Sequence, residues 1–418
     1  MPERPLSILL VTQFAPPAGF SAARRTAGLT KYLARLGHRI TVLTSLASAR
    51  GPIEGAARVI RTRDLVASRV NWRRSHFESV SGRADGAYRE APTRLASVVV
   101  PDLSLLGWLP FALVRARELL RRERIDCVIT SSPPESIHLL GLALRRLGIR
   151  WVADLQDGWT FETTHPTWPL GAQRALDSLL ERTVARHADL VTTVTDPITD
   201  DLRLRTGARV ITLTNGFDPD ERVRAGKRDV GLDPERFSLV YTGRLAFARS
   251  SPEPLVWALR AMDPEARARL EVVFAGPLAA SEQAALGAPD LADTVRTLGN
   301  VERDQALRLQ SAADALLILV PPDRSRSVAT AKLYEYMLAG RPILVLGEDN
   351  AAADIVRRTG TGVVTAADDP GRIARDLERL VSGAPSVRGD GREIERFSYP
   401  ELAARLAGEI RVLVEGAA

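Results

Sequence analysis

The sequence of 418 residues has little cysteine and no long apolar run, and each shortage excludes a class of structure. Cys127 is the single cysteine, so internal disulfides and metal sites built from several cysteines are excluded. Its place in the apolar run IDCVIT predicts a buried thiol and suits a reducing cytosol. No uncharged apolar run approaches the roughly 18 residues of a membrane-spanning helix. The amino terminus, MPERPLSILLVTQF, lacks the features of a signal peptide, so we expect a cytoplasmic protein.

Lysine is scarce although the net charge is +6. Such a charge suits nucleic acid, an anionic membrane surface or phosphorylated substrates. Acidic residues are interleaved with basic ones, and no zinc-finger spacing or RNA-binding aromatic pattern is present, so we expect no nucleic acid. Lys31, Lys227 and Lys332 are the only lysines among 57 basic residues. A lysine inside a motif is therefore a weak sign of a site that prefers a compact ammonium.

Apolar runs typical of buried strands alternate with helical patterns along the whole chain, which predicts an α/β fold with doubly wound parallel sheets. We predict strands at 7–12, 39–44, 57–61, 125–130, 150–154, 189–194 and 209–214, and then at 237–242, 270–275, 294–298, 315–320, 342–346 and 361–364. We place the boundary between two Rossmann-like domains, 1–215 and 216–398, near the segment 215–235. A closing helix within 399–418 has an apolar stripe, and we expect it to return to the first domain.

Residues 62–105 interrupt this alternation with a polar, weakly periodic excursion. The segment LLGWLPFALVRARELLRRER follows, with Trp108 and Phe111 in its apolar start and arginines in its end. One interpretation is a helix that covers the core and has a solvated end. The other is an amphipathic element that contacts a membrane surface.

The loops after strands are the candidate sites, because open α/β sheets bind ligands at the carboxyl ends of their strands. After the first strand, Gly19, Phe20 and Ser21 lead into a helix whose free amides attract anions, and Arg24 and Arg25 follow. We predict that this loop contacts a phosphate and that Arg24 or Arg25 reaches an anionic acceptor. The alternative is an ordinary strand–turn–helix connection with surface arginines.

The strand at 150–154 is followed by Gln156, Asp157 and Trp159 in the segment LQDGWTFE. Asp-Gly is a common turn dipeptide, so this carboxylate is either a turn former or a residue of the site.

Two stretches in the second half point to a nucleotide diphosphate. Gly243 and Arg244 end the strand at 237–242, and Arg249 follows, an arrangement that suits phosphate oxygens. In PDRSRSVATAKLYEYMLAGRPILVL, Lys332 lies in the first turn of a helix, where a cation opposes the helix dipole unless an anion is bound. Glu335 lies one turn deeper, where it can accept two ribose hydroxyls.

These segments together resemble the retaining glycosyltransferases of the GT-B fold, specifically family 4. The similarity covers nearly the whole chain and is carried by ILLVTQFAPPAGFSAARR, ADLQDGW, RADLVTTVTD, VITLTNGFDPDE, VYTGRL, VVFAGP, LGNVERDQALRLQSAADALLI and KLYEYMLAGRPIL. The resemblance implies two domains facing across a cleft, with the nucleotide-diphosphate sugar on the second domain.

The resemblance also implies roles for single residues. Arg244 and Arg249 would hold the diphosphate, Glu335 the ribose, and the backbone of Val301 the base. Further donor-binding residues would be Gly19, Phe20, Ser21, Gly243, Ser327, Thr330, Ala331 and Lys332. We take Gln156, Asp157, Arg244 and Lys332 as catalytic and Arg24, Arg25 and Trp159 as acceptor-binding. No metal or other cofactor is expected, because helix amides with Arg244 and Lys332 can stabilise the leaving diphosphate.

The sequence departs from the family pattern at two positions. Ser327 stands where the first glutamate of an E-x7-E motif is common, and Gln156 and Asp157 stand where a histidine is frequent. Two alternatives therefore remain beside sugar transfer, namely a GT-B-fold epimerase or phosphorylase and a non-catalytic partner protein. The acceptor is open between a small natural product and a lipid-linked glycan, with peripheral contact at the inner membrane face.

Overall fold

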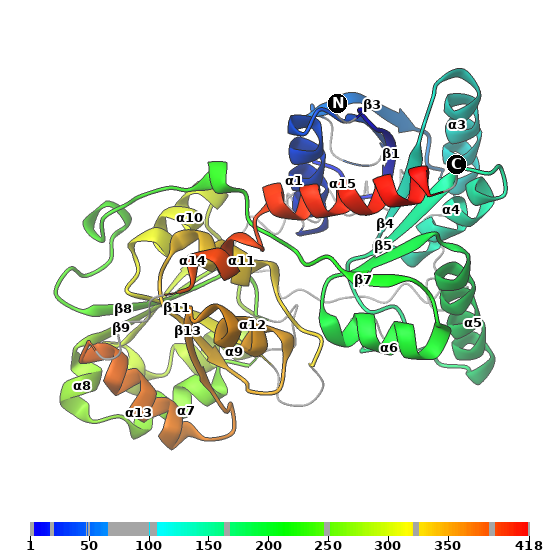
Figure 1. Cartoon of the computed structure of the whole chain (residues 1–418). Helices are drawn as coiled ribbons and strands as arrows, with labels where there is room; N and C mark the ends of the chain where they lie inside the picture. Colours follow the sequence, from blue (N-terminus) through cyan, green and yellow to red (C-terminus); the bar gives the residue numbers. More distant parts are fainter. Residues whose placement is uncertain are drawn as a thin grey trace. The chain divides into compact units, whose positions relative to one another are not determined.

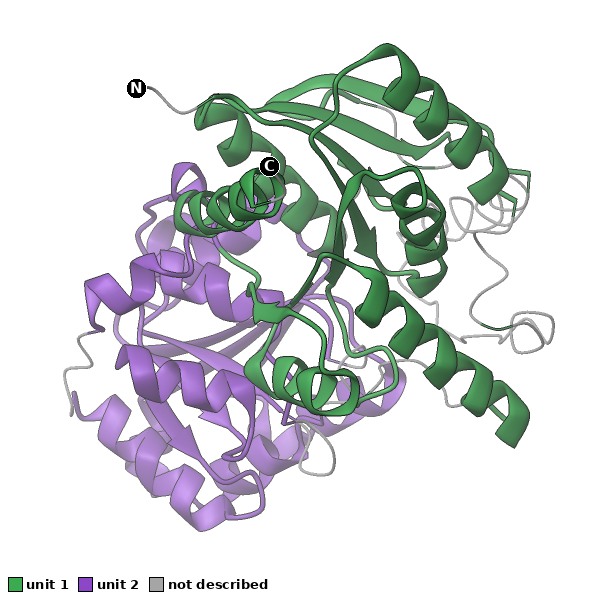
Figure 2. Cartoon of the chain, turned by 45° about the vertical axis from the view of Figure 1, so that its right-hand side comes forward, with its two compact units in different colours: residues 1–216, 399–418 green, residues 217–398 purple. Residues whose placement is uncertain are grey.

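The computed structural model describes residues 4–16, 21–46, 48, 51–65, 100, 107–162, 168–245, 251–320, 326–383 and 389–416. The chain divides into two compact units, which Figure 2 colours separately. Unit 1 comprises residues 1–216 and 399–418, and unit 2 comprises residues 217–398.

Unit 1 contains a seven-stranded parallel sheet with the order β3-β2-β1-β4-β5-β6-β7. Its strands are β1 (Ser7–Thr12), β2 (Arg39–Ser45), β3 (Ala56–Thr62), β4 (Cys127–Ser132), β5 (Arg150–Leu155), β6 (Leu190–Thr193) and β7 (Val210–Thr212). Its helices are α1 (Ser21–Arg35), α3 (Leu109–Arg122), α4 (His138–Arg145), α5 (Gly171–His187), α6 (Asp196–Thr206) and α15 (Tyr399–Glu415).

Unit 2 contains a six-stranded parallel sheet with the order β10-β9-β8-β11-β12-β13. Its strands are β8 (Phe237–Thr242), β9 (Leu270–Ala275), β10 (Val295–Gly299), β11 (Ala315–Leu319), β12 (Ile343–Leu346) and β13 (Gly362–Thr365). Its helices are α7 (Glu253–Ala261), α8 (Pro264–Ala268), α9 (Ala280–Leu286), α10 (Arg303–Ala312), α11 (Ala331–Ala339), α12 (Ala351–Thr359), α13 (Pro370–Val381) and α14 (Gly391–Glu395).

The two strand orders confirm the doubly wound α/β class. In each unit, the first strand lies in the middle of the sheet. The next two strands extend the sheet on one side, and the remaining strands extend it on the other side. Alternate residues of β1 serve different faces, with Ile8 and Leu10 in one core cluster and Leu9 and Val11 in another. Because helices cover both faces, the strands are apolar throughout rather than alternating with polar residues.

The closing helix packs within unit 1, as expected. Figure 1 shows α15 running beside α1. The contact requires a small residue, because a Cβ atom at Gly28 would lie 2.3 Å from the Tyr399 ring. Leu402, Leu406 and Ile410 lie in the same core cluster as the strands of the sheet.

The helix after the polar excursion covers the core. Trp108 is fully buried and its indole N–H donates to Thr62 Oγ1 over 2.7 Å. Ala112, Ala116 and Leu119 form the buried side of α3. The interpretation of Trp108 as part of a membrane-binding segment is therefore wrong, because its ring is already in the core. Most of the 62–105 excursion lies outside the described residues, and none of the helices described is long and apolar enough to cross a membrane.

Candidate functional site

The turn after β8 brings a glycine against the lysine of α11. Gly243 has a φ of +94°, a conformation that side chains other than glycine rarely adopt. A Cβ atom at this position would lie 3.7 Å from both Cε and Nζ of Lys332. The backbone of Gly243 is also packed tightly against Gly276, where a Cβ atom would come within 2.3 Å of the Gly243 carbonyl oxygen. The φ angle therefore favours glycine at position 243, and the close approach of the Gly243 backbone requires glycine at position 276.

Lys332 connects the start of α11 with the end of β8. Its Nζ donates to the Tyr241 hydroxyl and lies 3.8 Å from the centre of the Tyr241 ring. The Tyr241 hydroxyl in turn donates to the carbonyl oxygen of Arg244 over 3.1 Å. Burial lowers the pKa of Lys332 to about 7, because the ammonium loses hydration there. The Arg244 side chain is exposed beside this turn.

The first turn of α11 offers backbone amides next to Lys332. Thr330 is the N-cap residue in an extended conformation, and its side chain makes no capping hydrogen bond. The preceding segment is fixed on α12, where Ala351 N–H donates to Arg326 O over 2.9 Å and Ala352 N–H donates to Val328 O over 3.0 Å. Uncapped amides and a lysine at one helix start attract an anion.

Glu335 lies one turn further along α11, where two donors fix its carboxylate. Arg303 Nη1 donates to one oxygen over 2.9 Å, and Gln310 Nε2 donates to the other over 3.2 Å. Gln310 is 1% exposed and also donates to Thr242 Oγ1 over 2.8 Å at the end of β8. The carboxylate, the β8 turn and the start of α11 therefore form one connected group of polar residues in unit 2.

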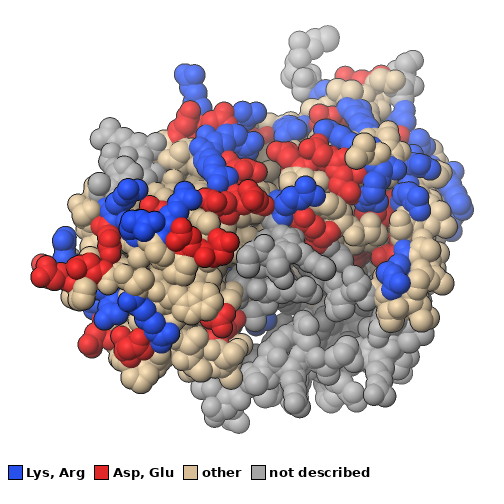
Figure 3. Space-filling view, turned by 90° about the horizontal axis from the view of Figure 1, so that it is seen from below, with Lys and Arg blue, Asp and Glu red and all other residues tan. Residues whose placement is uncertain are grey.

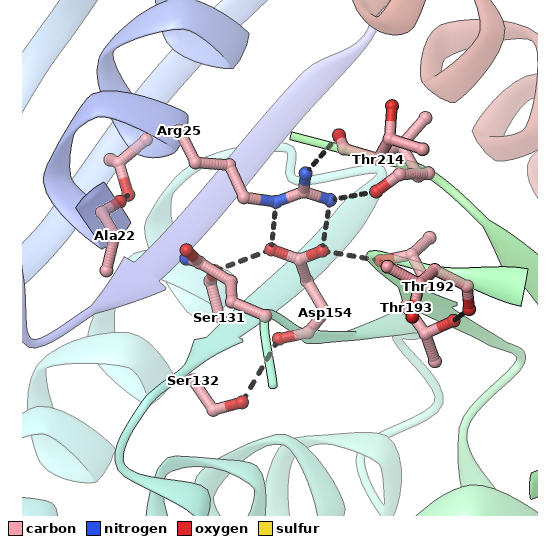
Figure 4. A network of polar contacts seen from close by, with 12 residues as sticks. Ala22, Arg25, Ser131, Ser132, Asp154, Thr192, Thr193 and Thr214 are labelled. Atoms are coloured by element: carbon pink, nitrogen blue, oxygen red, sulfur yellow. Dashed lines mark hydrogen bonds and ion pairs between the residues drawn. The ribbon is translucent and has the colours of Figure 1, made fainter. Parts of the chain in front are cut away.

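A second polar network lies at the carboxyl end of the unit 1 sheet (Figure 4). Arg25 of α1 is fully buried, and its Nε and Nη2 donate to the two oxygens of Asp154 over 3.1 and 2.7 Å. Its remaining donors reach the carbonyl oxygens of Thr214 at 2.6 Å and Leu213 at 2.9 Å. Arg25 thus joins α1, β5 and the segment that follows β7.

Asp154 accepts two further hydrogen bonds, from the hydroxyls of Ser131 and Thr192, each over 2.6 Å. Burial raises the pKa of this carboxyl, but the charge of Arg25 and the four hydrogen bonds outweigh it and lower the pKa overall. Gln156 Nε2 donates to Ser131 Oγ over 2.9 Å, so the network reaches the first residue after β5.

The turn after Gln156 is attached to α5. Trp159 is 4% exposed and its indole N–H donates to Asp177 over 2.8 Å. A Cβ atom at Gly158 would lie 1.9 Å from the Phe161 carbonyl oxygen, so this turn also requires glycine. Asp157, between Gln156 and Gly158, is partly exposed.

The charged residues on the described part of the surface in Figure 3 are interspersed, with lysines and arginines beside carboxylates. Among the described residues, no group of three or more His, Cys, Asp or Glu side chains is arranged to hold a metal ion.

Two family models match the chain. The "Glycosyl transferase 4-like domain" matches residues 21–216, and "Glycosyl transferases group 1" matches residues 236–383. The chain belongs to the group 1 glycosyltransferases.

Solved structures of GT-B enzymes share the fold of this glycosyltransferase. Sucrose-phosphate synthase from Thermosynechococcus elongatus has a TM-score of 0.69 at 17% identity, covering 98% of this chain and 100% of that one. An α,α-trehalose-phosphate synthase (UDP-forming) from Burkholderia xenovorans, in complex with glucose-6-phosphate, has a TM-score of 0.63 at 13% identity, covering 97% and 100%. WaaG, from lipopolysaccharide biosynthesis, has a TM-score of 0.58 at 16% identity, covering 99% and 98%. A comparison with curated proteins finds no match.

The structure of this glycosyltransferase brings together most of the residues expected to bind the donor. Gly243, Arg244, Lys332 and Glu335 lie around the start of α11. The same helix start contains Thr330 and Ala331, Ser327 lies buried just before it, and Val301 follows β10 and packs on the core of unit 2. Gly19, Phe20 and Arg249 lie outside the described residues, as does the side chain of Ser21, the first residue of α1.

Two residues expected to bind the acceptor have structural roles instead. Arg25 is completely buried in its ion pair with Asp154, so its guanidinium is not offered to a ligand. Trp159 is buried in the core with its indole N–H bonded to Asp177. Arg24, the neighbour of Arg25, is partly exposed and keeps its assignment as a prediction.

Sequence reasoning missed Asp154, Gln310 and Arg303. The signal for Asp154 was present, because a carboxylate inside the apolar strand RWVADL must find a buried partner. Gln310 and Arg303 lie on an ordinary amphipathic helix, and nothing in their spacing indicates that both contact Glu335.

Proposed function

We propose that the protein transfers a sugar from a nucleotide-diphosphate sugar to an acceptor with retention of the anomeric configuration and without a metal ion. Arg244 and Lys332 bind the diphosphate, together with the amides around Thr330 and Ala331. Glu335 accepts the ribose hydroxyls, and the backbone of Val301 contacts the base. The acceptor is a small natural product or a lipid-linked glycan.

The observation that carries this proposal is the contact between Gly243 and Lys332 at the uncapped start of α11. The absent side chain at Gly243 leaves the ammonium, the helix amides and the exposed Arg244 around one small region. The two negative charges of a diphosphate would pair with Lys332 and Arg244 and accept hydrogen bonds from the helix amides. The bound anion would also favour the charged form of Lys332, whose pKa is lowered by burial.

The proposed reaction uses few residues outside this region. The bond between the anomeric carbon and the diphosphate oxygen breaks, and the acceptor hydroxyl oxygen forms its new bond on the same face of the sugar while its proton passes to the departing diphosphate oxygen. Negative charge develops on the departing diphosphate, where Arg244, Lys332 and the amides stabilise it. Positive charge develops on the sugar ring, and we assign its stabilisation to Gln156 and Asp157 after β5.

Isothermal titration calorimetry with UDP, GDP, ADP, dTDP and pyrophosphate tests the donor assignment. UDP comes first because one structural neighbour is UDP-forming. Lys332→Met should weaken UDP and pyrophosphate alike by about tenfold or more, because a charge-assisted contact is worth roughly 1.5–3 kcal/mol. Glu335→Gln should weaken UDP but leave pyrophosphate unchanged.

Arg308→Ala is the matched control, because Arg308 is exposed on α10. Unchanged UDP affinity in both Lys332→Met and Glu335→Gln would refute the assignment. Retention is tested separately, by the anomeric proton coupling of the product in NMR with any acceptor that supports turnover.

A further inference from the structure

One surface of unit 1 combines exposed leucines with a group of basic residues. We define the α5 face as Leu170, Leu176 and Leu179 together with the basic residues Arg145, Arg146, Arg186 and His187 at the junction of α4 and α5. The three leucines are 62%, 45% and 55% exposed. Figure 1 shows α5 beside α6 at the outside of unit 1.

The acidic residues of α5 lie on its buried side. Its only carboxylates, Asp177 and Glu181, are 8% and 2% exposed. Asp177 accepts from the indole N–H groups of Trp159 and Trp168 over 2.8 and 3.0 Å. Glu181 accepts from Arg205 over 2.8 Å. Because both acids are used internally, the outward side of the helix carries leucines and arginines without any acidic residue.

The basic half of the α5 face contains a pocket between α4 and α5. It has a volume of about 430 Å³ and is lined by Leu142, Arg145, Arg146, Thr183, Arg186 and His187. Neither α4 nor the rim of this pocket supplies a carboxylate, although Arg145 also pairs with Asp189 behind it at 3.0 Å. Three arginines around one hollow suit a phosphate group.

The apolar and basic halves lie along a single helix. Leu176 and Arg186 are ten positions apart, which corresponds to about 15 Å along the axis at 1.5 Å per residue. When such an amphipathic helix lies parallel to a membrane surface, its leucines reach the boundary of headgroups and acyl chains, and its arginines contact lipid phosphates. A second copy of the chain fits less well, because a twofold contact through this face would gather the arginines of both copies in one interface that supplies no carboxylate to pair with them.

We propose that the α5 face docks on an anionic lipid bilayer, with Leu170, Leu176 and Leu179 in the interface and a lipid phosphate in the pocket between α4 and α5.

Flotation of the full-length protein with phosphatidylcholine vesicles, with and without 30% phosphatidylglycerol, tests this proposal at low and high salt. The wild type should float with anionic vesicles at low salt and lose most of that binding at high salt. Leu176→Ser with Leu179→Ser, and separately Arg146→Glu with Arg186→Glu, should each lower the lipid partition coefficient by about tenfold or more.

Matched controls separate this face from other surfaces. Leu36→Ser with Leu46→Ser removes two leucines that are 48% and 42% exposed elsewhere on unit 1, and Arg117→Glu with Arg121→Glu reverses two exposed charges on α3. Both should float like the wild type. Circular dichroism and the UDP titration should be unchanged in all four variants.

Three results would overturn the proposal. The first is no flotation of the wild type with anionic vesicles, and the second is equal flotation of the α5 variants. The third is a dimer in sedimentation velocity that the leucine variants abolish while vesicle binding stays absent, which would assign the α5 face to a second copy.

Discussion

Removing the carboxylate of Asp154 should destabilise unit 1 more than any surface ion pair does. In Asp154→Ala, the guanidinium of Arg25 stays buried and loses its carboxylate partner, while it still donates to the carbonyl oxygens of Leu213 and Thr214. The hydroxyls of Ser131 and Thr192 lose their acceptor as well. Breaking a buried pair by removing one partner costs about 3–5 kcal/mol, so we expect a loss of about 4 kcal/mol in the free energy of unfolding.

The assay is urea denaturation followed by tryptophan fluorescence. Trp257 is the only tryptophan in the sequence of unit 2, so the signal mainly follows unit 1. A chain of two units need not unfold in one step, and the loss should therefore appear in the transition of unit 1. Far-ultraviolet circular dichroism would follow both units together.

The control is an exposed pair in the same unit. Arg203 and Asp200 are 3.7 Å apart with side chains 51% and 73% exposed, so Asp200→Ala should cost less than about 1 kcal/mol. The double variant Arg25→Met with Asp154→Leu removes both buried charges, and its loss should fall at least about 2 kcal/mol below the sum of the losses in the single variants Arg25→Met and Asp154→Leu. A loss below about 1 kcal/mol in Asp154→Ala, or simple additivity in the double variant, would refute the reasoning.

Four further outcomes follow from the same contacts. Because the folded pKa of Asp154 lies below its ordinary value of 3.8, its stabilisation is present above about pH 4 and lost as the pH falls further, and Asp154→Asn should flatten that acid limb in denaturation experiments. With a pKa of about 7, Lys332 is mostly neutral at pH 8, so UDP binding should take up a proton, seen by calorimetry in two buffers and absent in Lys332→Met. Gly243→Ala should weaken UDP by about tenfold without unfolding the protein, because alanine is strained at the positive φ of this turn and would shift the backbone beside Lys332 and Arg244. Ser131→Ala should lower kcat by about tenfold at an unchanged donor KM, because the amide of Gln156 is then free to turn.

The fold was predictable because its strands are apolar on both faces. Runs such as SILLVT and LEVVFA have no polar side to place toward solvent, so they indicate a sheet covered by helices on both sides. The start of a helix was harder to predict where prolines precede it. After Pro133 and Pro134, the chain first forms a short 3-10 turn, Glu135–Ile137, and only then continues as α4, because the two prolines delay regular helix formation.

The partners of buried polar residues were not predictable. Arg25 and Asp154 are 129 positions apart, and either residue alone looks like a ligand-binding candidate or a surface charge. Trp159 looked like a residue of the acceptor site, but Asp177 on α5 satisfies its indole. This contact also turns the Asp177 side of α5 toward the core of unit 1, so leucines of α5 lie on the exposed side. Helical spacing alone does not show which side of the helix is buried.

The network around Asp154 also fixes the orientation of a proposed catalytic side chain. Asp154 is ionised because its pKa is lowered, so it has no proton to donate, and the single hydroxyl proton of Ser131 must point toward it. Ser131 Oγ can then only accept from Gln156, which requires the amide NH₂ to face Ser131 and the carbonyl oxygen to face away. A carbonyl oxygen is the end of the amide dipole that favours a positive charge. Under the proposed mechanism, the ion pair that stabilises unit 1 therefore also turns Gln156 in the direction that an oxocarbenium-like sugar ring needs.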